Sequence, residues 1–597
     1  MTNAQSCTGR GLHGALRYRS AGELLPPLSI LAEMICGLFL LHFPWSRLHR
    51  TLSGVLLYGA RTFLTAYSAA RPYDQLGSYY LLYNETVKFV NRNAATVAKV
   101  FWWQILVFFP QNGYNTIEKV FVLRRLVRNM KKTKIVCTLG PACRNEETLS
   151  KMILAGMNVA RLNFSHGSYE EHKKNIEMLK DIRKKLNVPL PIMLDTKGPE
   201  LRIKTFKDHK INLNDGDEFT FTIDEIEGDQ TRVAVSYKGI VNDLQPGDTI
   251  LLNNGLLIFK VTEVTDRDVK TTVMVGGELS DKKSMFFPDK TLSLKYLSEQ
   301  DINDIIFGVE NGIDFIACSF TSKAQDIIDI RNLLKEHGDP DIDLIAKIES
   351  RSGVNNIDEI LEVANGIMVA RGDLGVEVPY EELPQIQKML IDKCRRAGKR
   401  CITATEMLES MINQPRPTRA EISDVANAVY DGTSAVMLSG ETAAGKYPVQ
   451  AVEAMAKICL ETEKHLPNKY DDKDVSILNP IDALSHSACV LAEDIGAKAI
   501  VVCSRSGGTA RKVSRFRPTI DIIGMTIEPQ SYRKLALSWG VTPVLSEEFT
   551  SMDVLFYHAK RAAIDTGIVQ KGDRIVITGG NPNGKSGNSN VINIEQI

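Results

Sequence analysis

A repeating pattern of short apolar runs constrains the fold of this 597-residue chain more than any other feature. Nearly every run ends in polar residues, and most neighbouring runs are separated by a stretch of helical length. Because parallel strands must be joined by a crossover connection, each repeat predicts a strand–helix–strand unit. Eight strands are expected, at 134–139, 158–162, 191–194, 314–318, 344–348, 366–369, 401–403 and 435–438.

Eight such repeats predict an α/β fold, a (β/α)8 barrel with functional side chains at the carboxyl ends of its strands. The clearest unit joins 344–348 to 366–369, and an amphipathic helix between them is indicated by the apolar spacing of Ile357, Ile360, Leu361 and Ala364. The expected polar strand ends are Asn163-Phe164-Ser165-His166, Asp195-Thr196-Lys197, Ser319, Glu349, Asp373, Thr405 and Ser439-Gly440-Glu441.

Two further domains are expected. Residues 198–292 interrupt the barrel after its third strand, and their period-two runs at 218–223 and 232–237 predict a small β-barrel lid hinged over the site. Residues 467–597 predict a C-terminal α/β regulatory domain with parallel strands at 499–503, 520–525, 541–545 and 574–578. The barrel itself is assigned to 130–197 and 293–466.

The first 129 residues differ from the remainder, with 14 Lys and Arg against 5 Asp and Glu and three of the four tryptophans. Three interpretations are open. The apolar run Leu28–Phe43 suggests a membrane role, but it contains Glu33 and is short of the roughly 20 residues that a spanning helix needs. A targeting peptide is the second interpretation. The third, which we favour, is a non-native extension with little stable packing, because Met130 stands as a natural start immediately before the first strand.

Charge and cysteine content narrow the class of protein. Residues 130–597 hold 58 Lys and Arg against 67 Asp and Glu, without a basic stripe interleaved with aromatic residues, which argues against a nucleic-acid partner. The ten cysteines include no CxxC pair, so we expect reduced thiols in a cytosolic protein.

Two carboxylates at neighbouring strand ends predict a metal site. Glu349 and Asp373 supply oxygen ligands for a hard divalent cation and leave other coordination positions to a substrate. The alternative is an ion pair with Lys347 or Arg371, which would bury several charges for little net gain. Lys347 is a point charge suited to a phosphoryl group.

Six motifs, in order along the chain, resemble those of the pyruvate kinase family from about Met130 to the C-terminus, some 468 residues. They are Ile135-Val136-Cys137-Thr138-Leu139-Gly140-Pro141, 160–167, Leu194-Asp195-Thr196-Lys197-Gly198-Pro199-Glu200, 346–349, 368–377 and Pro415-Arg416-Pro417-Thr418-Arg419-Ala420-Glu421. The resemblance implies a cytoplasmic homotetramer that transfers a phosphoryl group from phosphoenolpyruvate to ADP, giving pyruvate and ATP. It also implies Mg2+ or Mn2+, and usually K+.

The resemblance assigns roles around the substrate. It places Lys347 and Arg161 at phosphate, Glu349 and Asp373 on the divalent metal, and backbone N–H groups at Gly372 and Asp373 on the substrate carboxylate. Thr405 resembles the threonine near the enolate carbon, where its hydroxyl helps a proton reach C3 through water. A plain strand residue at 405, and direct protonation by Lys347, remain open alternatives.

Further roles follow from the same resemblance. The potassium ligands would be Asn163, Ser165, Asp195 and Thr196, and Glu200 is the residue type that accompanies potassium dependence. The nucleotide contacts would be Asn163, His166, Arg202 and Lys283, although a turn-capping histidine and an exposed lid arginine are alternatives. An effector-phosphate loop is expected at Ser504, Arg505, Ser506, Gly507, Gly508 and Thr509, with 579–590 closing over fructose bisphosphate, another sugar phosphate or AMP. A tight surface turn is the alternative there.

Some positions depart from the family pattern. The return from the lid reads Lys283-Ser284-Met285-Phe286-Phe287-Pro288-Asp289, which weakens the case for Lys283, and Glu406 and Ser434 replace the usual Gln and Asp. Other functions must also be weighed. A catalytically silent effector-binding homologue would be expected to lose Lys347, Glu349 or Asp373, and all three are present. Another metal-dependent barrel acting on phosphoenolpyruvate or pyruvate would not need both the lid and the potassium set. A membrane-tethered scaffold directed by residues 1–129 is the third alternative.

Overall fold

The computed structural model describes residues 131–288, 290, 292–338, 340–466, 477, 479–580 and 589–597. The predictions for the first 129 residues, including the apolar run Leu28–Phe43, lie outside the described residues. No helix within the described ranges is long and apolar enough to cross a membrane.

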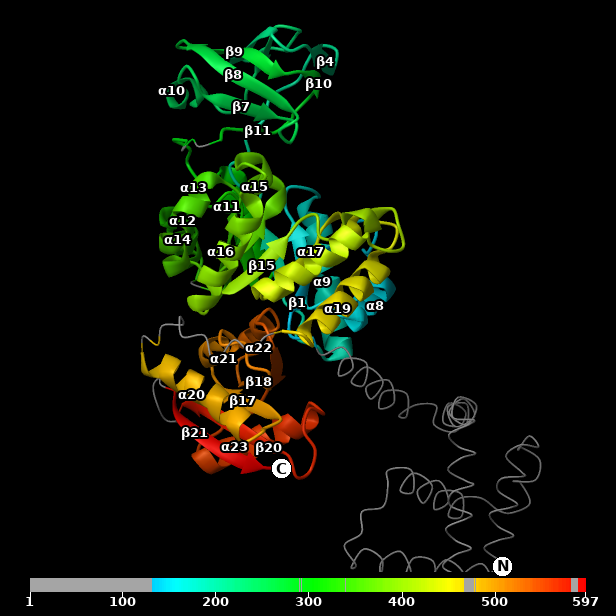
Figure 1. The fold of residues 1–597 in the computed structure, drawn as a ribbon, viewed down its shortest axis with the longest axis vertical. Helices are drawn as coiled ribbons and strands as arrows, with labels where there is room; N and C mark the ends of the chain where they lie inside the picture. Colours follow the sequence, from blue (N-terminus) through cyan, green and yellow to red (C-terminus); the bar gives the residue numbers. More distant parts are fainter. Residues whose placement is uncertain are drawn as a thin grey trace, which may run out of the picture. The chain divides into compact units, whose positions relative to one another are not determined.

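Eight parallel strands form a closed barrel, which confirms the predicted fold class. Each predicted strand is present within one or two residues of its expected bounds. Going round the barrel, the strands are β1 (Lys134–Thr138), β16 (Ala435–Leu438), β15 (Arg400–Ala404), β14 (Gly366–Ala370), β13 (Asp343–Ile348), β12 (Phe315–Cys318), β3 (Ile192–Asp195) and β2 (Val159–Asn163). In Figure 1, β1 and β15 of this barrel are labelled among the helices that cover it.

Helices follow the barrel strands, and several begin at a residue whose side chain caps the first turn, a pattern that is visible in the sequence. Ser298 and Thr418 each form a capping box with an acidic residue three positions later, which satisfies backbone donors at the first turn. The helix predicted from Ile357, Ile360, Leu361 and Ala364 is present as α14 (Ile357–Val363), and a short helix, α13 (Arg351–Asn355), precedes it. The others are α8 (Glu146–Ala155), α9 (Tyr169–Leu186), α11 (Glu299–Glu310), α12 (Ala324–Glu336), α15 (Arg371–Glu377), α16 (Leu383–Arg396), η1 (Glu409–Ile412), α17 (Arg419–Asp431), α18 (Gly440–Ala443) and α19 (Pro448–Glu463).

The insert after β3 is a β domain around an aromatic core, in which Phe219, Phe221 and Phe259 are buried. Its six-stranded sheet runs β11 (Met285–Phe286), β7 (Thr249–Leu252), β8 (Leu257–Val264), β9 (Asp268–Val275), β5 (Glu218–Thr222) and β6 (Arg232–Ala234), beside a pair formed by β10 (Gly277–Ser280) and β4 (Lys210–Leu213). A short helix, α10 (Ile240–Asp243), precedes β7. The two runs of alternating residues pair in parallel as β5 and β6, not as a hairpin.

The insert begins at a constrained glycine. Gly198 has φ +67°, and a Cβ there would stand 2.9 Å from both the Cβ and the carbonyl oxygen of Ser319. Its N–H donates to buried Asp301 at 3.0 Å. A larger residue would therefore clash and take up a strained backbone, so Gly198 fixes where the chain leaves the barrel.

The C-terminal domain is a five-stranded sheet with helices, as the sequence predicts. Its order is β19 (Val541–Leu545), β18 (Asp521–Thr526), β17 (Ala499–Cys503), β20 (Arg574–Gly580) and β21 (Ser589–Gln596). The first four strands are parallel, whereas β21, which the sequence analysis did not anticipate, is antiparallel to β20. The helices are α20 (Pro480–Asp494), α21 (Gly508–Ser514), α22 (Pro529–Leu535) and α23 (Met552–Asp565).

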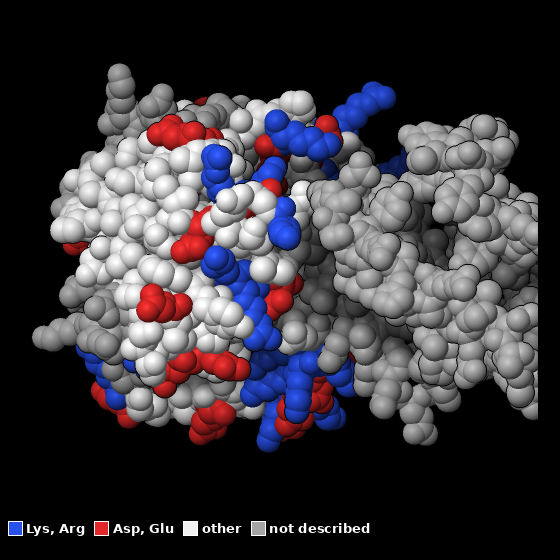
Figure 2. All heavy atoms as spheres, turned by 90° about the horizontal axis from the view of Figure 1, so that it is seen from below, with Lys and Arg blue, Asp and Glu red and all other residues white. Residues whose placement is uncertain are grey.

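Buried charges join the barrel to the C-terminal domain. Arg400, at the amino end of β15, pairs with Asp343 at 2.5 Å and donates through Nε to Ser538 Oγ at 3.2 Å. Lys534 of α22 also pairs with Asp343, at 3.1 Å. Although burial raises the pKa of Asp343, the charges of Arg400 and Lys534 outweigh it and hold that pKa below its usual value. Charges on the surface are also mixed in sign. On the face drawn in Figure 2, Lys and Arg side chains are interspersed with Asp and Glu.

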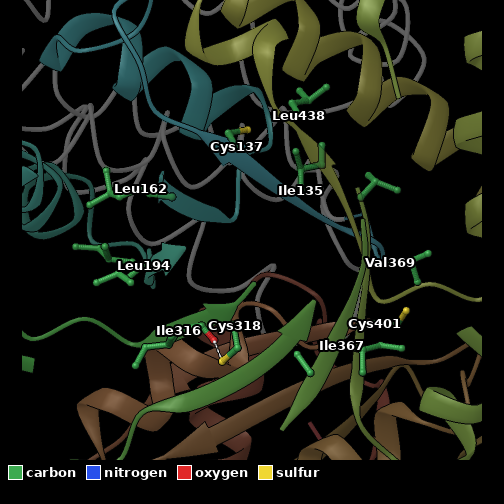
Figure 3. Close-up of a cluster of buried hydrophobic side chains, with 14 of the residues drawn as sticks. Ile135, Cys137, Leu162, Leu194, Ile316, Cys318, Ile367, Val369, Cys401 and Leu438 are labelled. Carbon is green, nitrogen blue, oxygen red and sulfur yellow. Dashed lines mark hydrogen bonds between the residues drawn. The ribbon is translucent and has the colours of Figure 1, made fainter. Parts of the chain in front are cut away.

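The barrel has two apolar layers. Outward-facing residues such as Leu162, Leu194 and Leu438 surround the ring of strands and pack beneath the helices (Figure 3). The inner layer draws on all eight strands, with members such as Phe315 and Ile402, and fills the interior. Leu537 of the C-terminal domain belongs to this inner layer and is fully buried. The barrel core is therefore completed by another domain.

Replacing Leu537 with Ala should leave a cavity in the inner layer. We expect the free energy of unfolding to fall by about 2–5 kcal/mol, measured by denaturant unfolding followed by far-UV circular dichroism. Leu545→Ala is the matched control, because Leu545 in β19 is 48 % exposed and its truncation should leave the midpoint nearly unchanged. Equal losses in the two variants would contradict the role given to Leu537.

Candidate active site

A buried ammonium group lies at the centre of the carboxyl end of the barrel. Lys347 Nζ, on β13, is 3.1 Å from Asp195 Oδ1 and 3.0 Å from Glu349 Oε1, and it donates to Ser319 Oγ at 2.7 Å. Burial alone would lower the pKa of Lys347, but Asp195 and Glu349 outweigh it and raise that pKa above its usual value. Lys347 is therefore a fixed positive charge at neutral pH.

Asp195 joins this lysine to an arginine. Arg161, on the neighbouring β2, donates through Nε to Asp195 Oδ2 at 2.7 Å and through Nη1 to Thr138 Oγ1 at 2.8 Å. Asp195 is 1 % exposed, and although its burial raises its pKa, the charges of Arg161 and Lys347 prevail and hold that pKa below the usual value. Two cations are thus presented together at the end of the barrel, with one buried carboxylate between them.

Two carboxyl groups face each other beside Lys347. Asp373, in α15, lies close enough to Glu349 for the two carboxyl groups to affect each other's pKa. Burial raises the pKa of Glu349, and the charge of Asp373 raises it further against the effect of Lys347. Burial likewise raises the pKa of Asp373, with Glu200 adding to the effect. The ion pair that the sequence analysis named as an alternative is formed between Lys347 and Glu349. Asp373 instead lies beside the carboxyl group of Glu349.

This pair fits a hard divalent cation. A buried carboxyl group and a half-buried one beside it repel each other when ionised, and a divalent ion between them would remove that repulsion. Among the described residues no group of three or more His, Cys, Asp or Glu side chains could hold a metal. Glu349 and Asp373 would supply two oxygen ligands to such an ion, and Mg2+ commonly keeps water or substrate oxygens in addition.

Thr405 and Gly372 meet across the ends of β15 and β14. Gly372 N–H donates to Thr405 Oγ1 at 2.8 Å, and that hydroxyl donates to Ala404 O at 2.6 Å. The amide predicted to receive a carboxylate is therefore occupied by Thr405 in this structure. A substrate carboxylate at Gly372 would lie beside the threonine hydroxyl.

The predicted potassium ligands lie on two neighbouring strands. Asn163 and Asp195 are register partners on β2 and β3, and Asn163 Oδ1 accepts from Ser165 N at 3.0 Å. Thr196 Oγ1 accepts from Ser319 N at 3.1 Å. His166 stands in the same turn as Ser165 and is exposed. The four oxygen-bearing residues are thus at one side of the barrel end, with Asp195 shared between this set and the two cations.

Two predicted nucleotide contacts lie on the insert. Arg202 pairs with Glu200 at 2.5 Å and donates to the carbonyl of Lys282 at 2.6 Å. Lys283 is placed by its backbone, whose carbonyl accepts from Ile203 N at 3.0 Å. The structure therefore ties Arg202 to Glu200 at the base of the insert, and Glu200 is near enough to Asp373 to act on its charge.

The predicted effector loop joins β17 to α21. Arg505 pairs with Glu528 at 2.8 Å, Gly507 has φ +71°, and Thr509 Oγ1 lies 2.6 Å from Ser589 Oγ on β21. The predicted closing segment 579–590 lies mostly outside the described residues. Ser504 and Ser506 contact neighbouring residues through their backbone, Ser504 N donating to Met525 O and Ser506 O accepting from Arg511.

Three contacts around Lys347 were not assigned a role from the sequence. Ser319 Oγ accepts from Lys347 and donates to Thr196 O at 2.6 Å. Phe320 N–H donates to Glu349 Oε2 at 2.6 Å, and Thr138 accepts from Arg161. The polar end of β12 pointed to Ser319, whereas the backbone donor at Phe320 carries no side-chain signal.

Comparison with known proteins identifies the family of the chain. The sequence model of the pyruvate kinase barrel domain matches residues 130–452, and that of the pyruvate kinase alpha/beta domain matches residues 482–595. The chain belongs to the pyruvate kinase family. Family membership makes it a phosphotransferase and confirms the resemblance drawn from the six motifs.

Individual relatives cover most of the chain. The pyruvate kinase of Bacillus licheniformis is 46 % identical over 471 residues, 78 % of this chain and 80 % of the relative. That of Clostridium acetobutylicum is 44 % identical over 474 residues, 78 % of this chain and all of the relative. The crystal structure of a pyruvate kinase from Cryptosporidium parvum superposes with a TM-score of 0.75 at 36 % identity, covering 79 % of this chain and 97 % of that one.

Removing the charge of Asp195 should leave two buried cations facing each other. We expect Asp195→Asn to lower the free energy of unfolding by about 3–5 kcal/mol, measured by denaturant unfolding. Asp565→Asn is the control, since Asp565 is 69 % exposed and its weak pair with Arg561 should leave the midpoint unchanged. A stable Asp195→Asn variant would show that Arg161 and Lys347 do not depend on this carboxylate.

Proposed function

We propose that this chain transfers the phosphoryl group of phosphoenolpyruvate to ADP, giving pyruvate and ATP. The observation that carries the proposal is the contact of Lys347 with Asp195 and Glu349, beside Asp373. Phosphoryl transfer needs positioned positive charge more than covalent help from the protein. The carboxyl end of the barrel supplies two fixed cations and a pair of carboxyl groups suited to a divalent ion.

Each side chain has a separate task in this proposal. Lys347 and Arg161 bind the transferring phosphoryl group, and the rigid contacts of Arg161 keep its remaining donors aimed at phosphate oxygens. Gly372 and the next amide of α15 bind the substrate carboxylate. Glu349 and Asp373 would hold Mg2+ or Mn2+, which would offset the negative charge of the substrate.

The second half of the reaction is a proton transfer. After the phosphoryl group leaves, C3 of the enolate of pyruvate must take up a proton. Thr405 lies beside Gly372, which binds the substrate carboxylate in this proposal, and its hydroxyl would orient the water that delivers the proton.

We propose that K+ activates the reaction. Asn163, Ser165, Asp195 and Thr196 offer neutral oxygens and a single carboxylate, a donor set suited to a weakly held monovalent ion. Glu200, the residue type that accompanies potassium dependence in the family, lies at the base of the lid. His166, Arg202 and Lys283 would contact the nucleotide, Arg202 after leaving its pair with Glu200.

Regulation and location complete the proposal. A sugar phosphate or AMP would bind at residues 504–509, where Arg505 would exchange Glu528 for a phosphate. The protein would work as a cytoplasmic homotetramer, by analogy with the family. The lid, barrel and C-terminal boundaries drawn from the sequence at 198, 293 and 467 are the proposed domain limits.

A lactate-dehydrogenase-coupled assay of the full chain tests this proposal. Pyruvate formation is expected only with phosphoenolpyruvate, ADP and a divalent cation together, with K+ increasing the rate. Sugar phosphates and AMP are added in separate runs to identify the effector. Absence of turnover under every ionic condition would refute the proposed reaction.

Replacing Lys347 with Met removes the charge at the transferring group. We expect kcat to fall by about 10²–10³-fold, measured in the coupled assay at saturating substrates. Lys534→Met is the matched control, because Lys534 is also buried and paired with two carboxylates but lies at the other end of the barrel. A comparable loss of kcat in the control would show that burial of the lysine, not its position, accounts for the effect.

Ser165 offers a direct test of the potassium set. Ser165→Ala removes one neutral ligand, and we expect the K+ concentration for half-maximal activity to rise about fivefold, the equivalent of roughly 1 kcal/mol. Titration of Mg2+ in the same variant serves as the control and should be unchanged. An unaltered response to K+ would place the ion elsewhere.

A further inference from the structure

The turn that carries Thr405 is conformationally unusual. Thr405 has φ +67° and Glu406 has φ +53°, so two consecutive residues with side chains occupy the left-handed region directly after β15. Thr405 is β-branched, and such residues disfavour that region more than most. A turn of this kind persists only when the surrounding structure holds it. The turn after β15 must therefore be held in place by contacts with neighbouring residues.

A single buried guanidinium contacts the turn. Arg371, the first residue of α15, is 9 % exposed. Its Nη2 donates to Thr405 O at 2.6 Å, its Nε donates to Ala404 O at 3.3 Å, and its Nη2 also lies 2.9 Å from Met407 Sδ. Arg371 therefore binds the carbonyls of the two peptide groups that flank Thr405.

The other edge of the guanidinium is fixed from a third element. Arg371 Nη1 pairs with Asp424 of α17 at 2.8 Å, and the same nitrogen is 3.4 Å from Gln387 Oε1 of α16. Asp424 thus orients the guanidinium of Arg371, and this guanidinium holds the turn after β15 in place. Arg371 does not pair with Glu349 or Asp373, the alternative considered from the sequence.

These contacts require an arginine. The guanidinium is planar and presents its donors in a fixed fork, so one group can reach the two carbonyls and the carboxylate together. An ammonium has three donors at a single point and cannot span acceptors on both sides. Lysine at 371 would keep the charge and the pair with Asp424 but release at least one carbonyl of the turn.

We propose that Arg371 is a positioning residue for the proton-transfer step, acting through the backbone of Thr405. The inference rests on the proposed role of Thr405. In that step the phosphorus–oxygen bond of phosphoenolpyruvate has broken, and the phosphorus has bonded to a terminal oxygen of ADP. The electron pair of the C2–C3 double bond of the enolate then takes a proton from water to form a C–H bond at C3, the enolate oxygen on C2 forms a double bond to carbon, and the hydroxide left behind takes up a proton from solvent. Arg371 fixes where the hydroxyl that orients this water stands.

The test compares Arg371→Lys with the unaltered full chain. We expect kcat to fall about 100-fold, the loss typical of a catalytic group displaced by about 1 Å, while KM for ADP stays within about twofold. The solvent deuterium isotope effect on kcat should increase, because protonation of C3 becomes rate-limiting. Asp424→Asn should show a smaller loss with the same increase, and it carries the test if Arg371→Lys does not fold.

Arg400→Lys is the matched control. Arg400 is also a buried arginine paired with one aspartate, and it lies at the amino end of β15, the strand whose carboxyl end leads into the Thr405 turn. This variant should lose stability but keep the kcat and isotope effect of the unaltered chain. A loss of kcat in Arg371→Lys without a larger isotope effect, or the same increase in Arg400→Lys, would overturn the inference.

Thr405→Val separates this inference from the proposal beneath it. If Thr405→Val leaves kcat and the isotope effect unchanged, the proposed role of Thr405 fails and the inference fails with it. If Thr405→Val slows protonation but Arg371→Lys and Asp424→Asn do not, only the inference about Arg371 fails. Increased isotope effects in all three variants support both.

Discussion

The site depends on the sharing of buried charge between Lys347 and the carboxylates around it. Asp195 lies between the ammonium of Lys347 and the guanidinium of Arg161 and pairs with both, and Glu349 adds a second contact to Lys347. The same arrangement leaves Asp373 and Glu349 in mutual contact. The strands bring these groups together because the carboxyl ends of parallel strands meet at one edge of the barrel. The charges therefore depend on the fold, because the closed ring of strands is what brings each buried charge next to its partner.

The order of the strands places one half of the chemistry on each side of Lys347. The β2 and β3 ends supply Arg161, Asp195 and the oxygen-rich set, whereas the β14 and β15 ends supply Gly372, Asp373 and Thr405. Lys347, on β13, contacts the first group directly and the second through Glu349. Phosphate binding and proton transfer are thus assigned to different strands in the proposed mechanism. A variant on one side of Lys347 would therefore alter one step and spare the other.

Much of this could be predicted from the sequence, for physical reasons that can be stated. Buried parallel strands are continuous apolar runs, and polar residues mark their functional ends, so the strands and the placement of Glu349 and Asp195 at strand ends followed from pattern alone. The backbone donor at Phe320 and the left-handed turn at Thr405 could not be predicted, because no side chain announces them. Arg371 and Asp424 are 53 positions apart, and only the fold brings them together. β21 was missed because its burial is irregular and it runs against its neighbours.

The insertion of Leu537 into the base of the barrel has a consequence for how the chain evolves and can be divided. A barrel whose interior is sealed by a residue from a later domain is not an autonomous folding unit, even though its strands are complete by residue 438. Truncation after the last barrel helix would expose the apolar floor of the ring to water. Mutations that loosen the C-terminal domain would therefore also loosen the scaffold that carries the chemistry, and the two must change together.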